Sequence, residues 1–104
     1  MKLDPQIVAK LKAEHPGAEL TQLASKGNII VVKSPSDGAW GAFLDAKEKV
    51  ATRAYKQLLF DCLVWPSADE LTSLLDRKPG LANVFGPKLM ELAGVEEEAT
   101  AKKL

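Results

Sequence analysis

Residues 58–81 read LLFDCLVWPSADELTSLLDRKPGL, and this stretch decides the fold expected of the chain. It contains the only cysteine, Cys62, followed by Trp65-Pro66, which ends the preceding helix. Ser67 and Glu70 have the spacing of a capping box, in which each side chain bonds the backbone N–H of the other residue at a helix start. The stretch therefore predicts a helix, a corner and a second helix, whose buried face is formed by Leu71, Leu74 and Leu75.

Before this corner, residues 37–63 follow a helical pattern with Ser36 placed as the N-cap. A polar interruption at 47–49 leaves open whether this is one long helix or two helices broken near residues 45–49. The apolar side chains recur at three- and four-residue steps: Trp40, Phe43, Leu44, Ala51, Ala54, Tyr55, Leu58, Leu59 and Cys62.

The N-terminal part of the chain predicts a short helix and a β-hairpin. Asp4 is a suitable N-cap and Pro5 a suitable first residue for a helix over 4–14. Residues 19–33 predict the hairpin, with residues 26–28 as its turn and the β-branched run 29–32 in its second strand. Four consecutive apolar residues indicate that this strand is covered, at least in part, on both faces. An isolated hairpin is marginally stable, so helices must pack on it or a partner must add a strand.

The last helix is expected after the break at 77–80, with a kink or late start at Gly86-Pro87 and Gly94 as its C-terminal cap. Its expected buried face consists of Leu81, Val84, Phe85, Leu89 and Leu92. The fold class that follows is α+β, mainly helical, with four to five helices and one N-terminal β-hairpin. Residues 1–94 are expected to form a single globular domain, and residues 95–104 a flexible acidic and polar tail.

Charge and composition exclude several classes of protein. The 104 residues carry 14 basic and 14 acidic side chains, a balance that argues against nucleic-acid binding. One cysteine forms no internal disulfide, which favours a reducing compartment. The N-terminus lacks the apolar region of a signal peptide, and no apolar run approaches the length of a membrane span. A cytoplasmic protein is expected.

The side chains capable of chemistry have structural explanations. His15 lies at a helix end beside Pro16, and Cys62 lies on the apolar face of a helix. A Cys–His pair between them stays open, although no third orienting group is marked. Glu70 is assigned to capping, and no phosphate-binding, zinc or nucleophile motif occurs. We therefore expect no catalytic, cofactor-binding or metal-binding residues. A small enzyme that uses Cys62 or His15 is the least favoured class.

Several motifs, spread over residues 19–94, resemble a family of small tail assembly chaperones from long-tailed phages and prophages. The similar features are a hairpin that ends in Pro-Ser, an amphipathic helix, a cysteine-containing apolar segment that runs into Pro-Ser, and a short acidic and leucine-rich helix. Pro-Gly-Leu and a final helix that ends in Ala-Gly follow. In this chain they are Pro35-Ser36, residues 62–67, Glu70-Leu71, residues 74–76, residues 79–81 and residues 92–94.

The resemblance implies a non-enzymatic chaperone that binds the tape measure protein, a long apolar helical protein, and keeps it soluble during tail assembly. The tail tube protein is a further candidate partner, and a homo-oligomer and a longer frameshifted product remain open. Such chaperones act in the host cytoplasm and are absent from the mature virion. We expect Phe60, Trp65 and Phe85 to border the groove for the partner helix. Phe60 and Trp65 lie off the apolar stripe, so they either wrap the core or form an exposed apolar patch. The alternative function is that of a small inhibitory or regulatory phage protein that binds a host protein complex.

Overall fold

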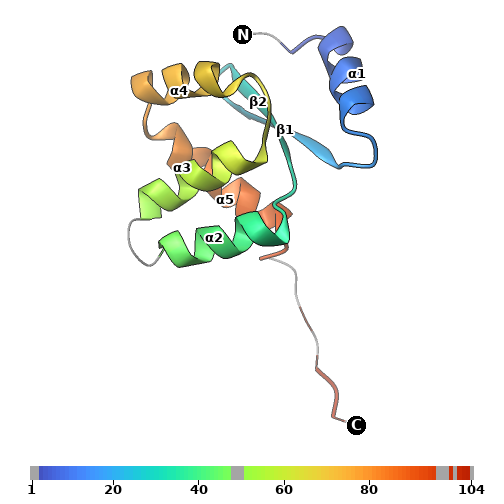
Figure 1. Cartoon of the computed structure of the whole chain (residues 1–104). Coiled ribbons are helices and arrows are strands. Elements are labelled where there is room, and N and C mark those ends of the chain that lie inside the picture. Colours follow the sequence, from blue (N-terminus) through green and yellow to red (C-terminus); the bar gives the residue numbers. More distant parts are fainter. Residues whose placement is uncertain (1–2, 48–50, 96–98, 100, 104) are drawn as a thin grey trace.

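The structure, a computed structural model, describes residues 3–47, 51–95, 99 and 101–103. Within these residues there are five helices and one three-stranded antiparallel sheet, which confirms the predicted fold class (Figure 1). The elements in chain order are α1 (Pro5–Glu14), β1 (Leu20–Ser25), β2 (Asn28–Lys33), α2 (Asp37–Lys47), α3 (Ala51–Cys62), β3 (Leu63–Trp65), α4 (Ala68–Arg77) and α5 (Leu81–Leu92).

The predicted hairpin is present and is closed by a two-residue turn. Lys26 and Gly27 both have positive φ, at 49° and 83°, which matches the twist of a tight hairpin. The strands pair in an unbroken register from Leu20 opposite Lys33 to Ser25 opposite Asn28. This register gives β1 and β2 equal lengths, with β2 in the centre of the sheet.

The third strand, β3, was missed by the sequence prediction of a plain helix–corner–helix. It pairs antiparallel with β2, with Trp65 opposite Val31 and Leu63 opposite Val32, and the register shifts between these two pairs. The chain therefore supplies the additional strand that the hairpin requires. β3 joins α3 to α4, so the corner is held to the sheet (Figure 1).

The helical pattern over residues 37–63 resolves into two helices, α2 and α3. The predicted break falls largely on residues 48–50, which lie outside the described part of the chain. The Ser36 Oγ accepts a hydrogen bond from the Ala39 N–H at 3.1 Å, as expected of the N-cap of α2. The helices lie side by side (Figure 1), and the Phe43 ring of α2 lies 5.5 Å from the Tyr55 ring of α3.

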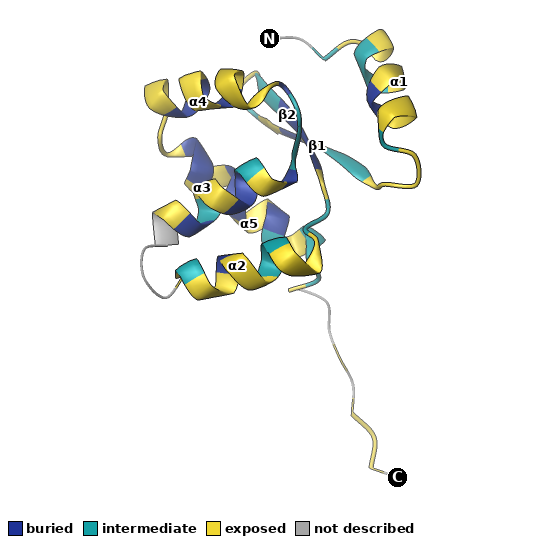
Figure 2. Cartoon of the chain, in the orientation of Figure 1, coloured by how far each residue is buried: buried dark blue, intermediate teal, exposed yellow. Residues whose placement is uncertain are grey.

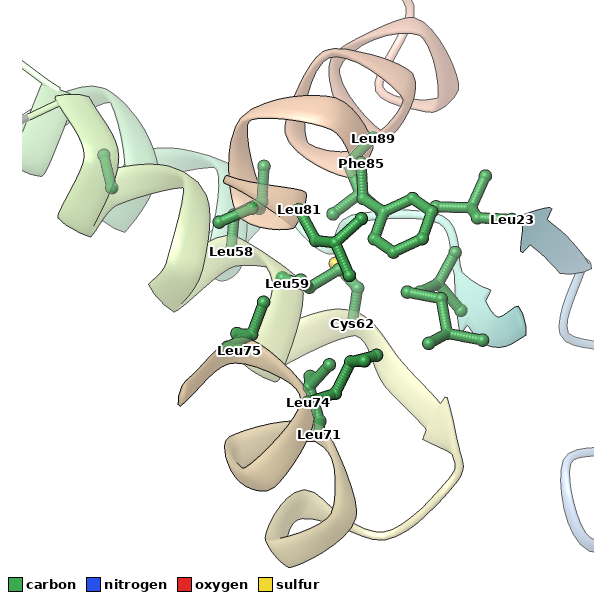
Figure 3. Packing of buried hydrophobic residues seen from close by; sticks show 14 of the residues in the cluster. Leu23, Leu58, Leu59, Cys62, Leu71, Leu74, Leu75, Leu81, Phe85 and Leu89 are labelled. Carbon is green, nitrogen blue, oxygen red and sulfur yellow. The ribbon is translucent and has the colours of Figure 1, made fainter. Parts of the chain in front are cut away.

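The core fills the space between the inner face of the sheet and helices α3, α4 and α5. In Figure 3, leucines of α4 approach Cys62 and Leu59 of α3 from one side, and Phe85 and Leu89 of α5 approach from the other. The predicted buried face of α4 is confirmed, and Ser67 caps this helix by accepting from the Glu70 N–H at 3.2 Å. These contacts place the helices on one face of the sheet.

α1 covers the opposite, outer face of the sheet. Its predicted cap is confirmed, because the Asp4 carboxylate accepts from the Ile7 N–H at 2.9 Å. Leu11 is its only buried residue, and Leu11 and Val31 are both buried without belonging to the main core cluster. Ile30 and Val32 belong to that cluster. The alternation along β2 confirms that this strand is covered on both faces.

Two apolar residues expected in the core are exposed. Val84 of α5 is 50% exposed and Leu44 of α2 is 45% exposed. The buried face of α5 is formed partly by small residues that a hydrophobic pattern does not mark: Leu81, Ala82, Phe85, Gly86 and Leu89. Gly86 lies against the Tyr55 side chain, so the face of α5 is rotated away from Val84 towards α3.

α5 runs from Leu81 to Leu92 with Pro87 inside it, so of the two expected alternatives, a kink or a late start, the late start is excluded. Gly94 has φ 95° and closes the helix as predicted, because the Gly94 N–H donates to the Glu91 C=O and the Val95 N–H to the Met90 C=O. Half of the flexible tail predicted over 95–104, namely residues 96–98, 100 and 104, lies outside the described residues.

Candidate protein-binding surfaces

The structure places the three predicted groove residues in three different environments. Phe85 is 1% exposed and belongs to the core, where part of its side chain also lines a hollow between β1 and α5. Phe60 of α3 is half-buried and packs against the core cluster. Trp65 of β3 is half-buried and pairs with Val31. They do not line one groove together.

Trp65 belongs with the outer face of the sheet. Residues that oppose each other in a β ladder project to the same face, and the partner of Trp65 is Val31, which lies outside the main core. Val31 also lines a cleft of about 90 Å³ beneath α1. The other residues of this cleft are Leu3, Val8, Leu11, Lys12, Leu20 and Gln22.

The contact between α1 and the sheet is small, and Figure 2 shows α1 with most of its surface exposed. A second, open hollow of about 470 Å³ continues along the same side of α1 from Leu3 to Lys12 and reaches Gln22. The outer sheet face is defined here as Leu20, Gln22, Val31 and Trp65. It carries a short amphipathic helix beside Leu20, Gln22 and Val31 without enclosing it.

A third space, which was not predicted, is a hollow between β1 and α5 at the edge of the sheet. It has a volume of about 300 Å³ and includes the exposed Val84. The residues that line it are Gln22, Leu23, Ala24, Val84, Phe85 and Lys88. The uncharged β1 strand is the only feature of the sequence that could have indicated this hollow. The position of Val84 beside β1 depends on the rotation of α5 and has no local signal.

The environment of Cys62 suppresses the chemistry of its thiol. Burial, reinforced by the neighbouring Asp61 carboxylate and opposed by Lys33, raises the pKa of Cys62 to about 11. The thiolate is the nucleophilic form, so the thiol is unreactive at neutral pH. His15 ends α1 on the outer side of the sheet, whereas Cys62 lies in the core on the inner side. The structure does not bring this pair together.

Among the described residues, no group of three or more His, Cys, Asp or Glu side chains is arranged to hold a metal ion. The helices described are all too short to cross a membrane.

Comparison with known proteins identifies a fold and a family. The chain is similar to the structure of the uncharacterised protein RBSTP2171 from Bacillus stearothermophilus, with a TM-score of 0.75 at 23% sequence identity. This similarity covers 92% of the present chain and 99% of the other, and it concerns the fold alone. No curated protein matches the sequence. A family described as a domain of unknown function (DUF6848) matches residues 19–102, from the start of the hairpin to the C-terminal segment, and the chain belongs to this family.

Proposed function

We propose that this protein is a tail assembly chaperone that binds an amphipathic helix of the tape measure protein on its outer sheet face. In this role it keeps the tape measure protein soluble in the host cytoplasm until the tail tube forms, and it is absent from the mature virion. The proposal combines the resemblance of residues 19–94 to such chaperones with one observation. The outer sheet face already carries a helix of the kind that a tape measure protein would present.

That helix is α1, which serves as a guide to the ligand. It is ten residues long and contacts the sheet through an apolar stripe centred on Leu11, with Lys10, Lys12 and Glu14 exposed. Recognition of an amphipathic helix by an apolar surface is a common mode of peptide binding. α1 lies outside the region matched by the family, which begins at residue 19. A partner helix that replaces α1 would therefore dock on the sheet and core, which lie within the region matched by the family.

Trp65 is the residue we assign to this interaction. It is an aromatic side chain on the outer sheet face that is already half-buried, and aromatic residues of this kind often dominate binding energy at interfaces. The closed core on the inner face gives the sheet a fixed shape, so the partner meets a surface that is already formed. Phe60 packs against that core, which gives it a structural contribution as well.

The test is co-purification with a helical segment of a phage tape measure protein. The full chain is expected to retain the segment, and Trp65→Ala is expected to lose it while keeping a cooperative thermal unfolding transition. Leu44→Ala serves as the matched control, because Leu44 is an exposed apolar residue on α2, away from the outer sheet face. This control variant should bind as well as the wild type.

The Phe60→Ala variant separates two versions of the proposal. If only Trp65→Ala loses the segment, the outer sheet face alone carries binding. If Phe60→Ala loses it as well, without loss of fold, the surface extends onto α3. Recovery of host proteins in place of tail proteins would instead support the inhibitory or regulatory alternative and would overturn the proposal.

A further inference from the structure

The β1 strand forms a free edge of the sheet. Among the described strands it pairs with β2 alone, so its outer side carries backbone groups without a partner strand. In an antiparallel ladder the N–H and C=O groups of alternate residues point to opposite sides of the strand. Counting from Ser25 and Asn28, which flank the two-residue turn, we infer that the groups pointing outwards belong to Leu20, Gln22 and Ala24.

This edge lacks the features that normally prevent pairing between sheets. Exposed edges are usually kept short or interrupted by charges, proline or bulges. The strand LTQLAS contains neither a charge nor a proline, and its six-residue register with β2 has no bulge. The opposite edge, β3, is only three residues long and is followed by Pro66. The sheet is protected on one side and open on the other.

The hollow beside the β1 edge adds an apolar contact surface. Val84 projects from α5 at 50% exposure and lines the hollow with Leu23 and Ala24 of β1. A strand that added to β1 would lie along this hollow and would cover Val84. One partner would therefore satisfy the unpaired backbone edge and bury the exposed valine.

We propose that the partner is a second copy of this chain, which pairs its β1 antiparallel with the first across a two-fold axis. The strand is flanked by Glu19 at its start and Lys26 at its end. Antiparallel pairing brings the Glu19 end of each copy beside the Lys26 end of the other, so opposite charges meet twice. A two-fold axis perpendicular to the sheet also puts both α5 helices on the same face, where each Val84 gains an apolar neighbour.

One antiparallel register lets the outward N–H and C=O groups of Leu20, Gln22 and Ala24 all form hydrogen bonds across the interface. In this register the two-fold axis passes between the Gln22 residues of the two copies. Gln22 then faces Gln22 of the other copy, and Leu20 and Ala24 face Ala24 and Leu20. The outcome is a continuous six-stranded sheet. The outer sheet faces of the two copies lie on the same side of this sheet, and both remain accessible. The pairing therefore does not depend on the proposed chaperone function.

The test is the mass of the full chain in solution over a concentration series, measured by sedimentation equilibrium. A dimer of twice the 11.2 kDa chain mass is expected. Gln22→Lys and Gln22→Glu should each weaken dimerisation roughly a hundredfold, because like charges then meet at the axis. An equimolar mixture of these two variants should recover the dimer as a heterodimer, which shows that both variants are folded.

Val84→Lys and Leu44→Lys form a matched pair, since both residues are exposed to a similar extent and only Val84 adjoins β1. Val84→Lys should weaken the dimer and Leu44→Lys should leave it unchanged. A wild-type chain that stays at 11.2 kDa at every concentration would overturn the proposal. A dimer that tolerates both charged variants at Gln22 would overturn it as well.

Discussion

At the scale of single residues, the packing of α5 on α3 depends on the absence of a side chain at Gly86. A Cβ atom built at Gly86 would lie 2.6 Å from the Tyr55 Cγ and 3.0 Å from the Tyr55 Cβ. These atoms lie at the base of the side chain and cannot swing away as a flexible end would. The Tyr55 ring is further fixed between Phe43 and Met90, whose Sδ accepts from the Tyr55 O–H at 3.7 Å.

Gly86→Ala is therefore expected to destabilise the protein by about 1–3 kcal/mol through overpacking, despite the higher helix propensity of alanine. Gly41→Ala is the control, because Gly41 is exposed in the middle of α2 and has nothing near its Cβ position. This second variant should stabilise by about 0.5–1 kcal/mol. Urea unfolding of both variants checks the pair, and a stabilising Gly86→Ala would disprove the close contact.

Cys62 should make stability depend on pH in the alkaline range. Burial raises its pKa from 9.0 to about 11, so the folded state holds the thiol proton more tightly than the unfolded chain. The associated stability is fully present below pH 9 and is lost as the pH rises towards 11. The loss amounts to about 2–3 kcal/mol.

Urea unfolding of the wild type and of Cys62→Ala at several pH values measures this effect. The difference in unfolding free energy between the two proteins should narrow between pH 9 and pH 11, because the other titrating groups are common to both. A difference that stays constant over this range would show that the thiol is not desolvated.

At the scale of elements, the sequence predicted those helices and strands whose signals are local. Asp4, Ser36 and Ser67 marked helix starts that the structure confirms. β3 was missed because a three-residue apolar strand directly after a helix looks like the end of that helix. Its identity depends on pairing with β2, about thirty residues earlier in the chain. Pairing at this sequence distance has no local signature.

The binding surfaces were less predictable than the fold. Val84 and Phe85 were both expected on the buried face of α5, and the structure buries Phe85 but leaves Val84 50% exposed. The cause is the small-residue face formed by Ala82 and Gly86, which turns α5 towards Tyr55. Hydrophobic periodicity gives weight to large residues, so the predicted buried face of α5 was displaced by about one residue from the observed one. Trp65 alone of the three predicted residues reached the outer sheet face.

α1 is expected to be the least firmly held helix of the described fold, because Leu11 is its single buried residue. Leu11→Ala should cost about 2 kcal/mol, at the low end of the range for such changes, whereas Leu59→Ala in the core should cost about 3–5 kcal/mol. Urea unfolding gives both values, and hydrogen exchange should show faster exchange of the α1 amides in Leu11→Ala only. Equal costs would show that α1 is an integral part of the core.

At the scale of the whole molecule, the sheet has three distinct surroundings. Its inner face is closed by α3, α4 and α5, and its outer face carries the loosely seated α1 (Figures 1 and 2). Its β1 edge has no neighbouring strand among the described residues. The closed inner face supplies stability. The other two surfaces are therefore available for a partner helix and for a second copy of the chain, without any change to the core.

If the tape measure helix docks where α1 lies, as we propose, the two helices compete for the outer sheet face. A ligand that needs this face free binds with an affinity reduced by the fraction of molecules in which α1 occupies it. Leu11→Asp should displace α1 within the full chain, because it introduces a charge at the buried position. The binding-competent fraction then approaches one.

Calorimetric titration of a tape measure segment into the wild type, Leu11→Asp and Trp65→Ala measures this competition. Leu11→Asp should bind the segment about tenfold more tightly than the wild type. Trp65→Ala should bind it about tenfold more weakly. Equal or weaker binding by Leu11→Asp, in a variant that still unfolds cooperatively, would contradict the proposed competition.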